Sequence, residues 1–215
     1  ITQYGLSLDS SSSSIIENST FHDNSLYGVY ITSSIGSILR NNTAYNNFYG
    51  FYLIGTLGSN DGKQLINNTA YNNQYGAYFQ YTTNDLAFNN SFYNNTQIGL
   101  SAQDNRNLTI QANQIFNNTL GSRFYGATFS SYNGSYNFDH FYNNVNDVKL
   151  QSNGGNTLFV SLNGVLFDNP TGNLTSYTNL SLNDTVGGGN SYFLSWSTAS
   201  SPLPGNVSSF RQKYV

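Results

Sequence analysis

The feature that most restricts the fold of this chain is a short phrase that it repeats with drift. The phrase reads NNTAYNNFYGFYL at residues 41–53 and NNTAYNNQYGAYF at residues 67–79, and a looser copy, NNSFYNNTQIGLSA, occupies residues 89–102. Aligning the copies on their glycine gives intervals of 23, 22, 26, 23 and 27 residues along the column Gly5, Gly28, Gly50, Gly76, Gly99 and Gly126, and Asp147 follows 21 residues later. A period in this range is typical of a solenoid, in which each repeat is one coil.

The residue types indicate which kind of solenoid the repeats build. Tyr, Phe, Ile, Thr and Asn occur in short alternating runs that are broken by Gly and by Asn pairs, which favours strands and turns over helices. Leucine-rich repeats are the rival solenoid of similar period, but their leucine spacing and helical half-repeat are missing.

The alternation assigns side chains to faces, because successive side chains of a strand point to opposite sides. We expect two apolar columns to point inward, namely Leu6, Val29, Phe51, Ala77, Leu100, Ala127 and Val148, and Leu8, Ile31, Leu53, Phe79, Ala102, Phe129 and Leu150. The column between them, which we expect to point outward, is Ser7, Tyr30, Tyr52, Tyr78, Ser101, Thr128 and Lys149. The sequence therefore predicts an all-β fold, a right-handed parallel β-helix of about seven coils, with the handedness taken from the crossover preference.

A column of asparagines fits the same architecture: Asn18, Asn42, Asn68, Asn90 and Asn113. Asparagine tolerates the left-handed backbone of corners, and stacked amides can hydrogen-bond from coil to coil. We favour this structural role over a ligand-binding role.

The phrase stops near residue 157. We therefore expect a parallel β-helix over residues 1–156, and over residues 157–215 a last irregular coil, a β-hairpin cap and a C-terminal linker or extension. The hairpin would join YTNLSL to SYFLSWS and cover the last coil with Trp196, and the alternative is the start of an immunoglobulin-like domain. The chain lacks an initiator Met, so we expect a processed product or a piece of a longer polypeptide.

Composition excludes several classes of function. The 215 residues include no Cys, no Met and two His, so we expect no disulfides, no metal site and no cofactor. Charged residues are 8% of the chain, its net charge is -3, and its seven basic residues are scattered, so we expect no nucleic-acid partner. No apolar run is long enough to predict a membrane span in this segment.

The repeat pattern I-x-N-N-T-x-x-N-N-x-x-G, followed by alternating apolar residues, resembles the parallel β-helix repeats of NosD-like and pectate-lyase-like proteins, especially those of archaeal cell-surface or S-layer-type glycoproteins. The resemblance covers about residues 1–156. It implies the fold and no single activity, because that family includes lyases, glycosidases, adhesins and structural proteins. Copper handling of the NosD-like kind would need clusters of Met, Cys or His, which this chain lacks.

Sequons for N-glycosylation are the second strong signal. They begin at Asn18, Asn41, Asn67, Asn89, Asn94, Asn107, Asn117, Asn133, Asn173, Asn179, Asn183 and Asn206. A chain so rich in Asn, Ser and Thr also generates sequons by chance. In the NNT and NNS phrases, however, the second asparagine belongs to the inward column, so the acceptor before it should face solvent.

A catalytic constellation is harder to find. Asp85, Asp104 and Arg106 lie in corresponding turns of adjacent coils and come nearest to one, but such residues are usually turn formers, and we expect no catalytic residues. His22 and His140 are expected to be turn or edge residues. Tyr30, Tyr52 and Tyr78 form an outward stripe that could contact carbohydrate or a partner, although tyrosine stacking alone also stabilises a sheet. The loops at residues 55–63 and 120–123 are expected to lengthen their coils and offer places for binding.

From these observations we expect a non-enzymatic, heavily N-glycosylated structural protein of an archaeal surface layer, filament or adhesive appendage, located outside the cell at its surface. Its partners would be copies of itself or other surface-protein domains, covalent N-glycans and possible external carbohydrate. The alternative is a carbohydrate-active enzyme, either a polysaccharide lyase or a glycosidase, or a carbohydrate-binding module on the same scaffold.

Overall fold

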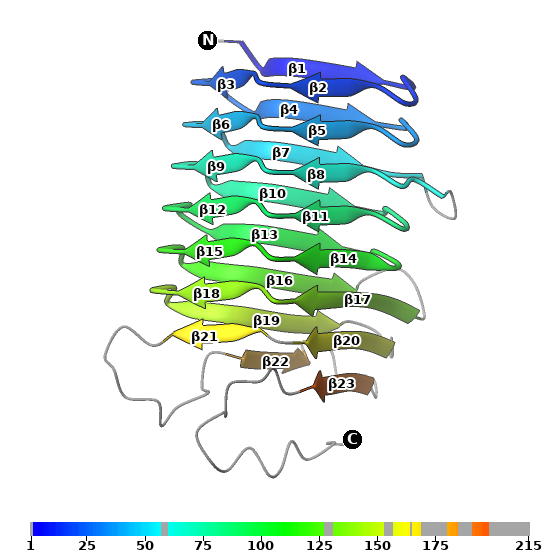
Figure 1. The fold of residues 1–215 in the computed structure, drawn as a ribbon, viewed down its shortest axis with the longest axis vertical. Helices are drawn as coiled ribbons and strands as arrows, with labels where there is room; N and C mark the ends of the chain where they lie inside the picture. Colours follow the sequence, from blue (N-terminus) through cyan, green and yellow to red (C-terminus); the bar gives the residue numbers. More distant parts are fainter. Residues whose placement is uncertain are drawn as a thin grey trace.

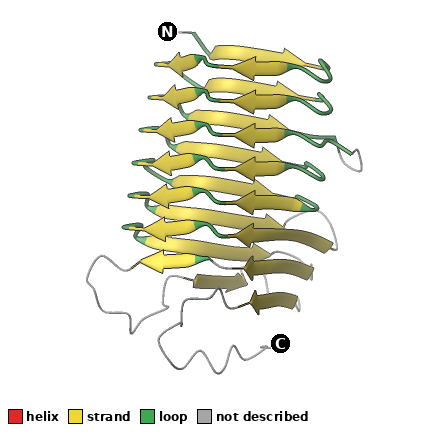
Figure 2. Ribbon diagram, in the orientation of Figure 1, coloured by secondary structure: helices red, strands yellow, loops and turns green. Residues whose placement is uncertain are grey.

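The structure is a computed structural model that describes residues 2–56, 60–126, 131–152, 157–163, 165–168, 180–184 and 191–197. All regular structure in these residues is β-strand, and they contain no helix that could cross a membrane. The strands stack as coils along one axis (Figure 1), and short loops join them (Figure 2).

Each coil contributes one strand to each of three sheets. The first sheet contains β1 (Tyr4–Asp9), β4 (Tyr27–Thr32), β7 (Tyr49–Ile54), β10 (Tyr75–Gln80), β13 (Ile98–Gln103), β16 (Leu120–Gly126), β19 (Asn146–Ser152) and β22 (Leu180–Asp184). The second contains β2 (Ile15–Glu17), β5 (Ile38–Arg40), β8 (Gln64–Ile66), β11 (Leu86–Phe88), β14 (Leu108–Gln111), β17 (Ser131–Asn137), β20 (Thr157–Asn163) and β23 (Ser191–Ser197). The third contains β3 (Thr20–His22), β6 (Thr43–Tyr45), β9 (Thr69–Tyr71), β12 (Ser91–Tyr93), β15 (Gln114–Phe116), β18 (His140–Tyr142) and β21 (Leu166–Asp168).

All neighbouring strands within these sheets pair in parallel, so the predicted parallel β-helix is confirmed. The register also agrees with the repeat, because Val29 lies opposite Phe51, which in turn lies opposite Ala77. Inward side chains from the three sheets form one hydrophobic core inside the coils. The buried members of the two predicted inward columns are Val29, Phe51, Ala77, Leu100 and Val148, and Ile31, Leu53, Phe79, Ala102 and Leu150.

The predicted register of the sixth coil is wrong by five residues. Gly121, and not Gly126, continues the glycine column, since its position follows Gly99 and precedes Asp147. The inward residues of this coil are therefore Ser122 and Phe124, and the outward residue is Arg123. Ala127, Thr128 and Phe129, which the sequence placed in those columns, lie outside the described residues. Residues 120–123 likewise belong to strand β16 and do not form the predicted loop.

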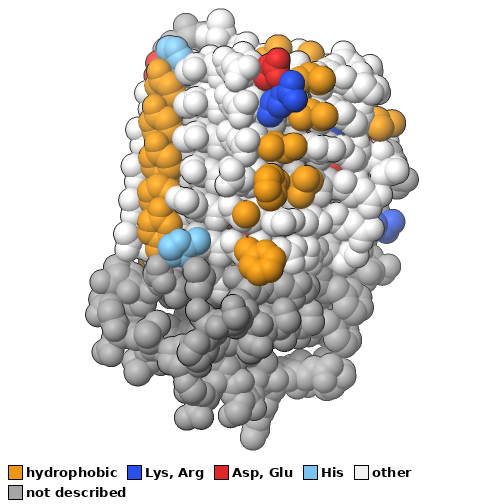
Figure 3. All heavy atoms as spheres, in the orientation of Figure 1, with side chains coloured by type: hydrophobic (Ala, Val, Ile, Leu, Met, Phe, Trp, Pro, Cys, Tyr) orange, Lys and Arg blue, Asp and Glu red, His pale blue; other side chains and the backbone are white. Residues whose placement is uncertain are grey.

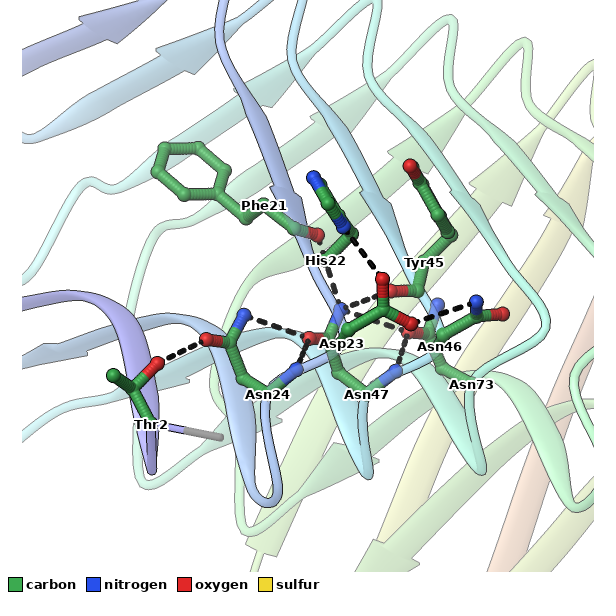
Figure 4. A network of polar contacts seen from close by, with 9 residues as sticks. All are labelled: Thr2, Phe21, His22, Asp23, Asn24, Tyr45, Asn46, Asn47 and Asn73. Carbon is green, nitrogen blue, oxygen red and sulfur yellow. Dashed lines mark hydrogen bonds and ion pairs between the residues drawn. The ribbon is translucent and has the colours of Figure 1, made fainter.

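Two ladders of buried asparagine amides run along the solenoid. In each step, the backbone N–H and the Nδ2 of one asparagine both donate to the Oδ1 of the next, as Asn90 does to Asn113 at 2.8 and 2.9 Å. One ladder is Asn42, Asn68, Asn90, Asn113 and Asp139, and the other is Asn24, Asn47, Asn73, Asn95, Asn118 and Asn144 (Figure 4 shows its first members). The predicted coil-to-coil bonding of asparagines is confirmed, and these bonds satisfy buried backbone donors at the corners. The left-handed backbone predicted for the same column instead belongs to the residue before each ladder asparagine, as at Asn41, Asn67 and Asn89.

Asn18 does not belong to the buried ladder in which the sequence placed it. Its neighbour Ser19 occupies that position and donates its backbone N–H to the Oδ1 of Asn42 at 3.0 Å. Asn18 itself is exposed and stacks on Asn41 at the outer corner, as the bond from its N–H to the carbonyl of Arg40 shows.

The predicted β-hairpin cap is also wrong. Strands β22 and β23 pair in parallel with β19 and β20 and so continue the first two sheets as a further coil. Period-two alternation is the same in a hairpin strand and in a coil strand, so the sequence could not distinguish them. The immunoglobulin-like alternative is wrong as well, because both strands belong to a further coil of the solenoid. The side chain of Trp196 lies outside the described residues. The second and third sheets continue beyond residue 156, where the sequence placed the end of the β-helix, because β20 and β21 extend them.

Candidate functional site

The outer face of the first sheet carries two adjoining columns of tyrosines. The first column, one position before the glycine, is Tyr4, Tyr27, Tyr49 and Tyr75, and the second is Tyr30, Tyr52 and Tyr78. Rings in the first column stack face to face, with centroids 5.0–5.3 Å apart. Rings of the second column tilt against the first, as Tyr49 and Tyr52 do at 46°. We call these seven residues the tyrosine face.

Burial changes the acidity of this face. Desolvation, followed by the charges of Tyr78, Tyr75 and Tyr27, raises the pKa of Tyr49 to about 12. Desolvation also raises the pKa of Tyr52 and of Tyr78, and the nearby Arg123 guanidinium opposes the rise at Tyr78. All three phenols are therefore protonated at neutral pH, and they can act as hydrogen-bond donors. The Tyr52 and Tyr78 hydroxyls donate to the side-chain carbonyls of Gln80 and Gln103.

Two cations extend this face beyond the tyrosines. Arg123 of β16 and Lys149 of β19 lie opposite each other in the same outward column as Tyr78 and Ser101. The Arg123 Nε and Nη2 donate to the Ser101 Oγ at 3.2 and 3.1 Å, and its guanidinium lies 5.5 Å from the ring centroid of Tyr125. Within the part of the chain that the structure describes, neither cation forms an ion pair with a carboxylate.

Tyr30, Tyr52 and Tyr78 form one column on the outer face of the first sheet, as predicted, but they are less exposed than the sequence suggested. The three lie opposite one another on consecutive strands, yet Tyr78 is only 7% exposed because neighbouring side chains cover it. The sequence prediction missed the first tyrosine column, although its signal was the Tyr-Gly pair of each repeat. It missed Arg123 because the register of the sixth coil was wrong.

A second aromatic stripe lies on the outer face of the third sheet and was not predicted. It consists of six rings, which are His22, Tyr45, Tyr71, Tyr93, Phe116 and Tyr142. Figure 3 shows a continuous hydrophobic stripe on this side of the molecule. Neighbouring rings are within 13° of parallel with centroids 4.5–5.2 Å apart, so each ring covers the face of the next. A sugar could not lie flat on rings stacked in this way, and we assign the stripe to sheet stabilisation.

Asp85, Asp104 and Arg106, which came nearest to a catalytic constellation in the sequence, do not form a surface site. The two aspartates are buried and the arginine is exposed. Asp85 instead accepts a 2.7 Å bond from the backbone N–H of Lys63, whose Nζ pairs with Asp61 at 3.1 Å. Desolvation raises the pKa of Asp85 to about 7, and Lys63 opposes this rise. These groups lie inside the coil, where a polymer cannot reach them.

His22 lies in β3, the terminal strand of the third sheet, and is an edge residue as predicted, whereas His140 lies in β18, which pairs with a strand on each side. The Nδ1–H of His22 donates to the Asp23 carboxylate at 2.7 Å and the His22 ring stacks on Tyr45, while the ring of His140 lies 4.6 Å from that of Tyr142 (centroid to centroid). No group of three or more acidic, His or Cys side chains in the described residues could hold a metal ion. The insertion at residues 55–63 does lengthen its coil, and it brings Asp61 into the interior.

Eight of the sequon asparagines have described side chains. Seven of them are exposed and adopt left-handed backbone conformations with φ between 51° and 56°: Asn18, Asn41, Asn67, Asn89, Asn94, Asn107 and Asn117. Asn133 is half-buried within strand β17. Asn173, Asn179 and Asn206, and the side chain of Asn183, lie outside the described residues.

Comparison with solved structures shows which proteins share this fold. The chain is similar to the A-module of the mannuronan C-5 epimerase AlgE4 of Azotobacter vinelandii, with a TM-score of 0.57, 18% identity and coverage of 87% of this chain and 58% of that one. It is similar to the AlgE6 A-module of the same organism, with a TM-score of 0.56, 20% identity and coverage of 88% and 59%. It also resembles the periplasmic alginate epimerase AlgG, with a TM-score of 0.56, 17% identity and coverage of 91% and 48%. The chain thus spans less than two thirds of each of these structures.

These comparisons correct the expectation of a non-enzymatic protein. The three solved structures named above are mannuronan or alginate epimerases, so the scaffold gives no reason to exclude catalysis. A comparison of the sequence with curated proteins found no match. The family described as the right-handed beta helix region matches residues 4–179. The chain therefore belongs to the right-handed β-helix family, and the predicted handedness is confirmed.

Proposed function

We propose that this chain is a carbohydrate-active protein that holds an acidic polysaccharide along the outer face of its first sheet. The observation that carries the proposal is the adjacency of Arg123 and Lys149, which extend the tyrosine face without a carboxylate partner among the described residues. Half-buried cations without an internal counter-ion favour an anionic ligand. The similarity to alginate epimerases supports this choice, because alginate is a polymer of uronic acids.

The geometry of the face suits a linear polymer. Equivalent positions recur at about 4.8 Å from coil to coil, so tyrosine hydroxyls and glutamine amides form rows that can exchange hydrogen bonds with successive sugar hydroxyls. Gln80, Gln103 and Gln151 belong to one such row. The guanidinium of Arg123 could hold a uronate carboxylate through two parallel bonds once its contact with Ser101 opens.

The same contact has a chemical consequence. Neutralising the carboxylate of a uronic acid makes the neighbouring C-5 proton more acidic, and removal of that proton is the first step of both epimerisation and β-elimination. We assign this neutralising role to Arg123, with Lys149 supporting it on the next strand.

We also infer that the chain works outside the cytoplasm. Support comes from the periplasmic location stated for AlgG, with which it shares its fold.

The test is turnover of defined polymers. The purified chain would be incubated with polymannuronate, polygalacturonate and a neutral glucan, and proton NMR would follow the C-5 configuration and the formation of unsaturated ends. We expect a change in a polyuronate and none in the glucan, and we expect Arg123→Gln to lower the rate at least about tenfold. Arg40→Gln is the matched control, because Arg40 lies on the second sheet and pairs with Glu17. Equal rates in the two variants would contradict the assigned role, and activity confined to the neutral glucan would contradict the substrate class.

A further inference from the structure

The sequon asparagines differ in the availability of the atom that glycosylation modifies. N-glycosylation joins Nδ2 to the anomeric carbon of a lipid-linked oligosaccharide; Nδ2 loses a proton, and the lipid phosphate leaves. The acceptor must therefore present Nδ2 to solvent, and a bulky sugar must be able to leave the protein surface there.

We propose that five corner asparagines, Asn18, Asn41, Asn67, Asn94 and Asn117, are N-glycosylation sites of the exported chain. Each of the five is exposed and sits at a turn between two strands, with a left-handed backbone conformation (φ 51–56°). None of the five uses its Nδ2 in a hydrogen bond to another described residue. The ladder asparagines that follow Asn41, Asn67, Asn94 and Asn117 are buried, so these four corner positions themselves carry no packing role.

The other three described acceptors are not included in the proposed set. The Nδ2 of Asn89 donates to Asn67 at 2.9 Å and that of Asn107 donates to Asn84 at 2.9 Å. Asn133 donates its Nδ2 to Asn107, accepts a 2.9 Å bond from the backbone N–H of Asn107, and is half-buried within a strand. On any of these three, the glycan would be attached to a nitrogen that a hydrogen bond already holds against the neighbouring coil.

Most of the proposed glycans would lie away from the outer face of the first sheet. Asn18, Asn41 and Asn67 lie between strands of the second and third sheets, at a corner that belongs to neither edge of the first sheet. Asn94 and Asn117 lie where the third sheet leads into the first. Glycans on Asn18, Asn41 and Asn67 would thus leave the tyrosine face uncovered. This inference does not depend on the proposed function.

The experiment secretes the full chain from a eukaryotic host that performs N-glycosylation. Glycopeptides of the wild-type protein would be mapped by mass spectrometry, and intact masses would be compared for Thr43→Ala and Ser135→Ala. Thr43→Ala destroys the sequon of Asn41 and leaves Asn41 itself unchanged, and Ser135→Ala destroys the sequon of Asn133 in strand β17.

We expect glycans on the peptides of the five sites and bare peptides for Asn89, Asn107 and Asn133. Thr43→Ala should remove the mass of one glycan, and Ser135→Ala should change the mass by one oxygen only. Bare asparagines at the five sites, or a glycan lost from Ser135→Ala, would overturn the proposal. The mapping of the wild-type protein decides the matter even if a variant fails to fold.

Discussion

The backbone N–H and the Nδ2 of Asn68 both donate to a single atom, the Oδ1 of Asn90, at 2.8 and 3.2 Å. The Oδ1 of Asn68 in turn accepts bonds from the backbone N–H and the Nδ2 of Asn42. The Nδ2 of Asn68 also donates to the backbone carbonyls of Leu39 and Ile66. One amide therefore satisfies buried groups of three successive coils. This relationship explains why the second asparagine of the NN pair recurs and makes the ladder sensitive to substitution.

We predict that Asn68→Ala destabilises the protein by about 3 kcal/mol or more, since it leaves several buried donors and acceptors without partners. The adjacent Asn67→Gly is the matched control. Asn67 is exposed and has a φ of 55°, which glycine adopts freely, so this change should cost no more than about 0.5 kcal/mol. Urea unfolding followed by circular dichroism measures both, and similar losses would contradict the ladder's role.

Gly76→Ala should be strongly destabilising for a steric reason. A Cβ at Gly76 would lie 2.4 Å from the carbonyl oxygen of Gly99 in the next coil and 2.9 Å from the Nδ2 of Asn95. Coil-to-coil spacing would have to widen locally, which we expect to cost about 3 kcal/mol. At Gly62, a Cβ meets nothing within 4 Å but φ is 56°, so Gly62→Ala should cost only about 1 kcal/mol of backbone strain. A larger loss for Gly62→Ala in thermal unfolding would show that backbone strain and not close approach dominates.

Stability should fall between pH 4 and pH 7. Burial raises the pKa of Asp139 to about 7 and that of Asp85 to about 7, and both carboxyls are near their ordinary value in the unfolded chain. Folding therefore favours their protonated forms, so this stabilisation is complete below about pH 4 and is lost as the pH rises through about 7. Lys63 and Asp61 face Asp85, whereas Asp139 meets only hydrogen-bond donors.

Asp139→Asn isolates one of these two groups. The substitution keeps an acceptor for Asn113, so we expect a folded protein whose loss of stability over the same pH interval is about half that of the wild type. Denaturant midpoints at pH 4, 5.5 and 7 would measure the slope. An unchanged slope would mean that Asp139 ionises at an ordinary pKa in the folded state.

The tyrosine face should ionise late in an alkaline titration. Tyr49 has its pKa raised to about 12, mainly by desolvation, so its phenolate should form well above pH 10. Because the folded-state pKa is raised, this burial stabilises the fold below pH 10 and ceases to do so as the pH approaches 12. Ultraviolet difference spectra would resolve the late group, and Tyr49→Phe should remove one tyrosine from it. Loss of an early-titrating tyrosine instead would contradict the described burial.

Most of the fold could be predicted from the sequence because the repeat restates its own pattern. Phe51 points to the core and Tyr52 to the surface, and the same alternation occurs in several copies of the phrase. Agreement among the copies identifies the register even where one copy is ambiguous. The sixth coil escaped this check, since GSRFYG contains two glycines and the wrong one, Gly126, has the familiar Tyr-Gly pair. Asn18 was misplaced by one residue because Ser19 occupies the ladder position without an amide.

The site was less predictable for a different reason. Arg123 lies beside Ser101 and Lys149 only when the registers of three coils are right. The five-residue error in the predicted register of the sixth coil therefore hid this arrangement. The buried ion pair of Lys63 and Asp61 lies in an insertion that does not occur in the other coils, so the repeat pattern could not predict it. Local patterns specify strands and faces, whereas a site formed across coils requires every register to be right.

The central claim is that the outer face of the first sheet binds an acidic polysaccharide, and calorimetric titration with an oligomannuronate tests it most directly. We predict binding that Arg123→Gln weakens at least about tenfold, equivalent to about 1.4 kcal/mol, and that Arg40→Gln leaves unchanged. Equal affinities of the wild type and Arg123→Gln, or equally strong binding of a neutral oligosaccharide, would contradict the claim.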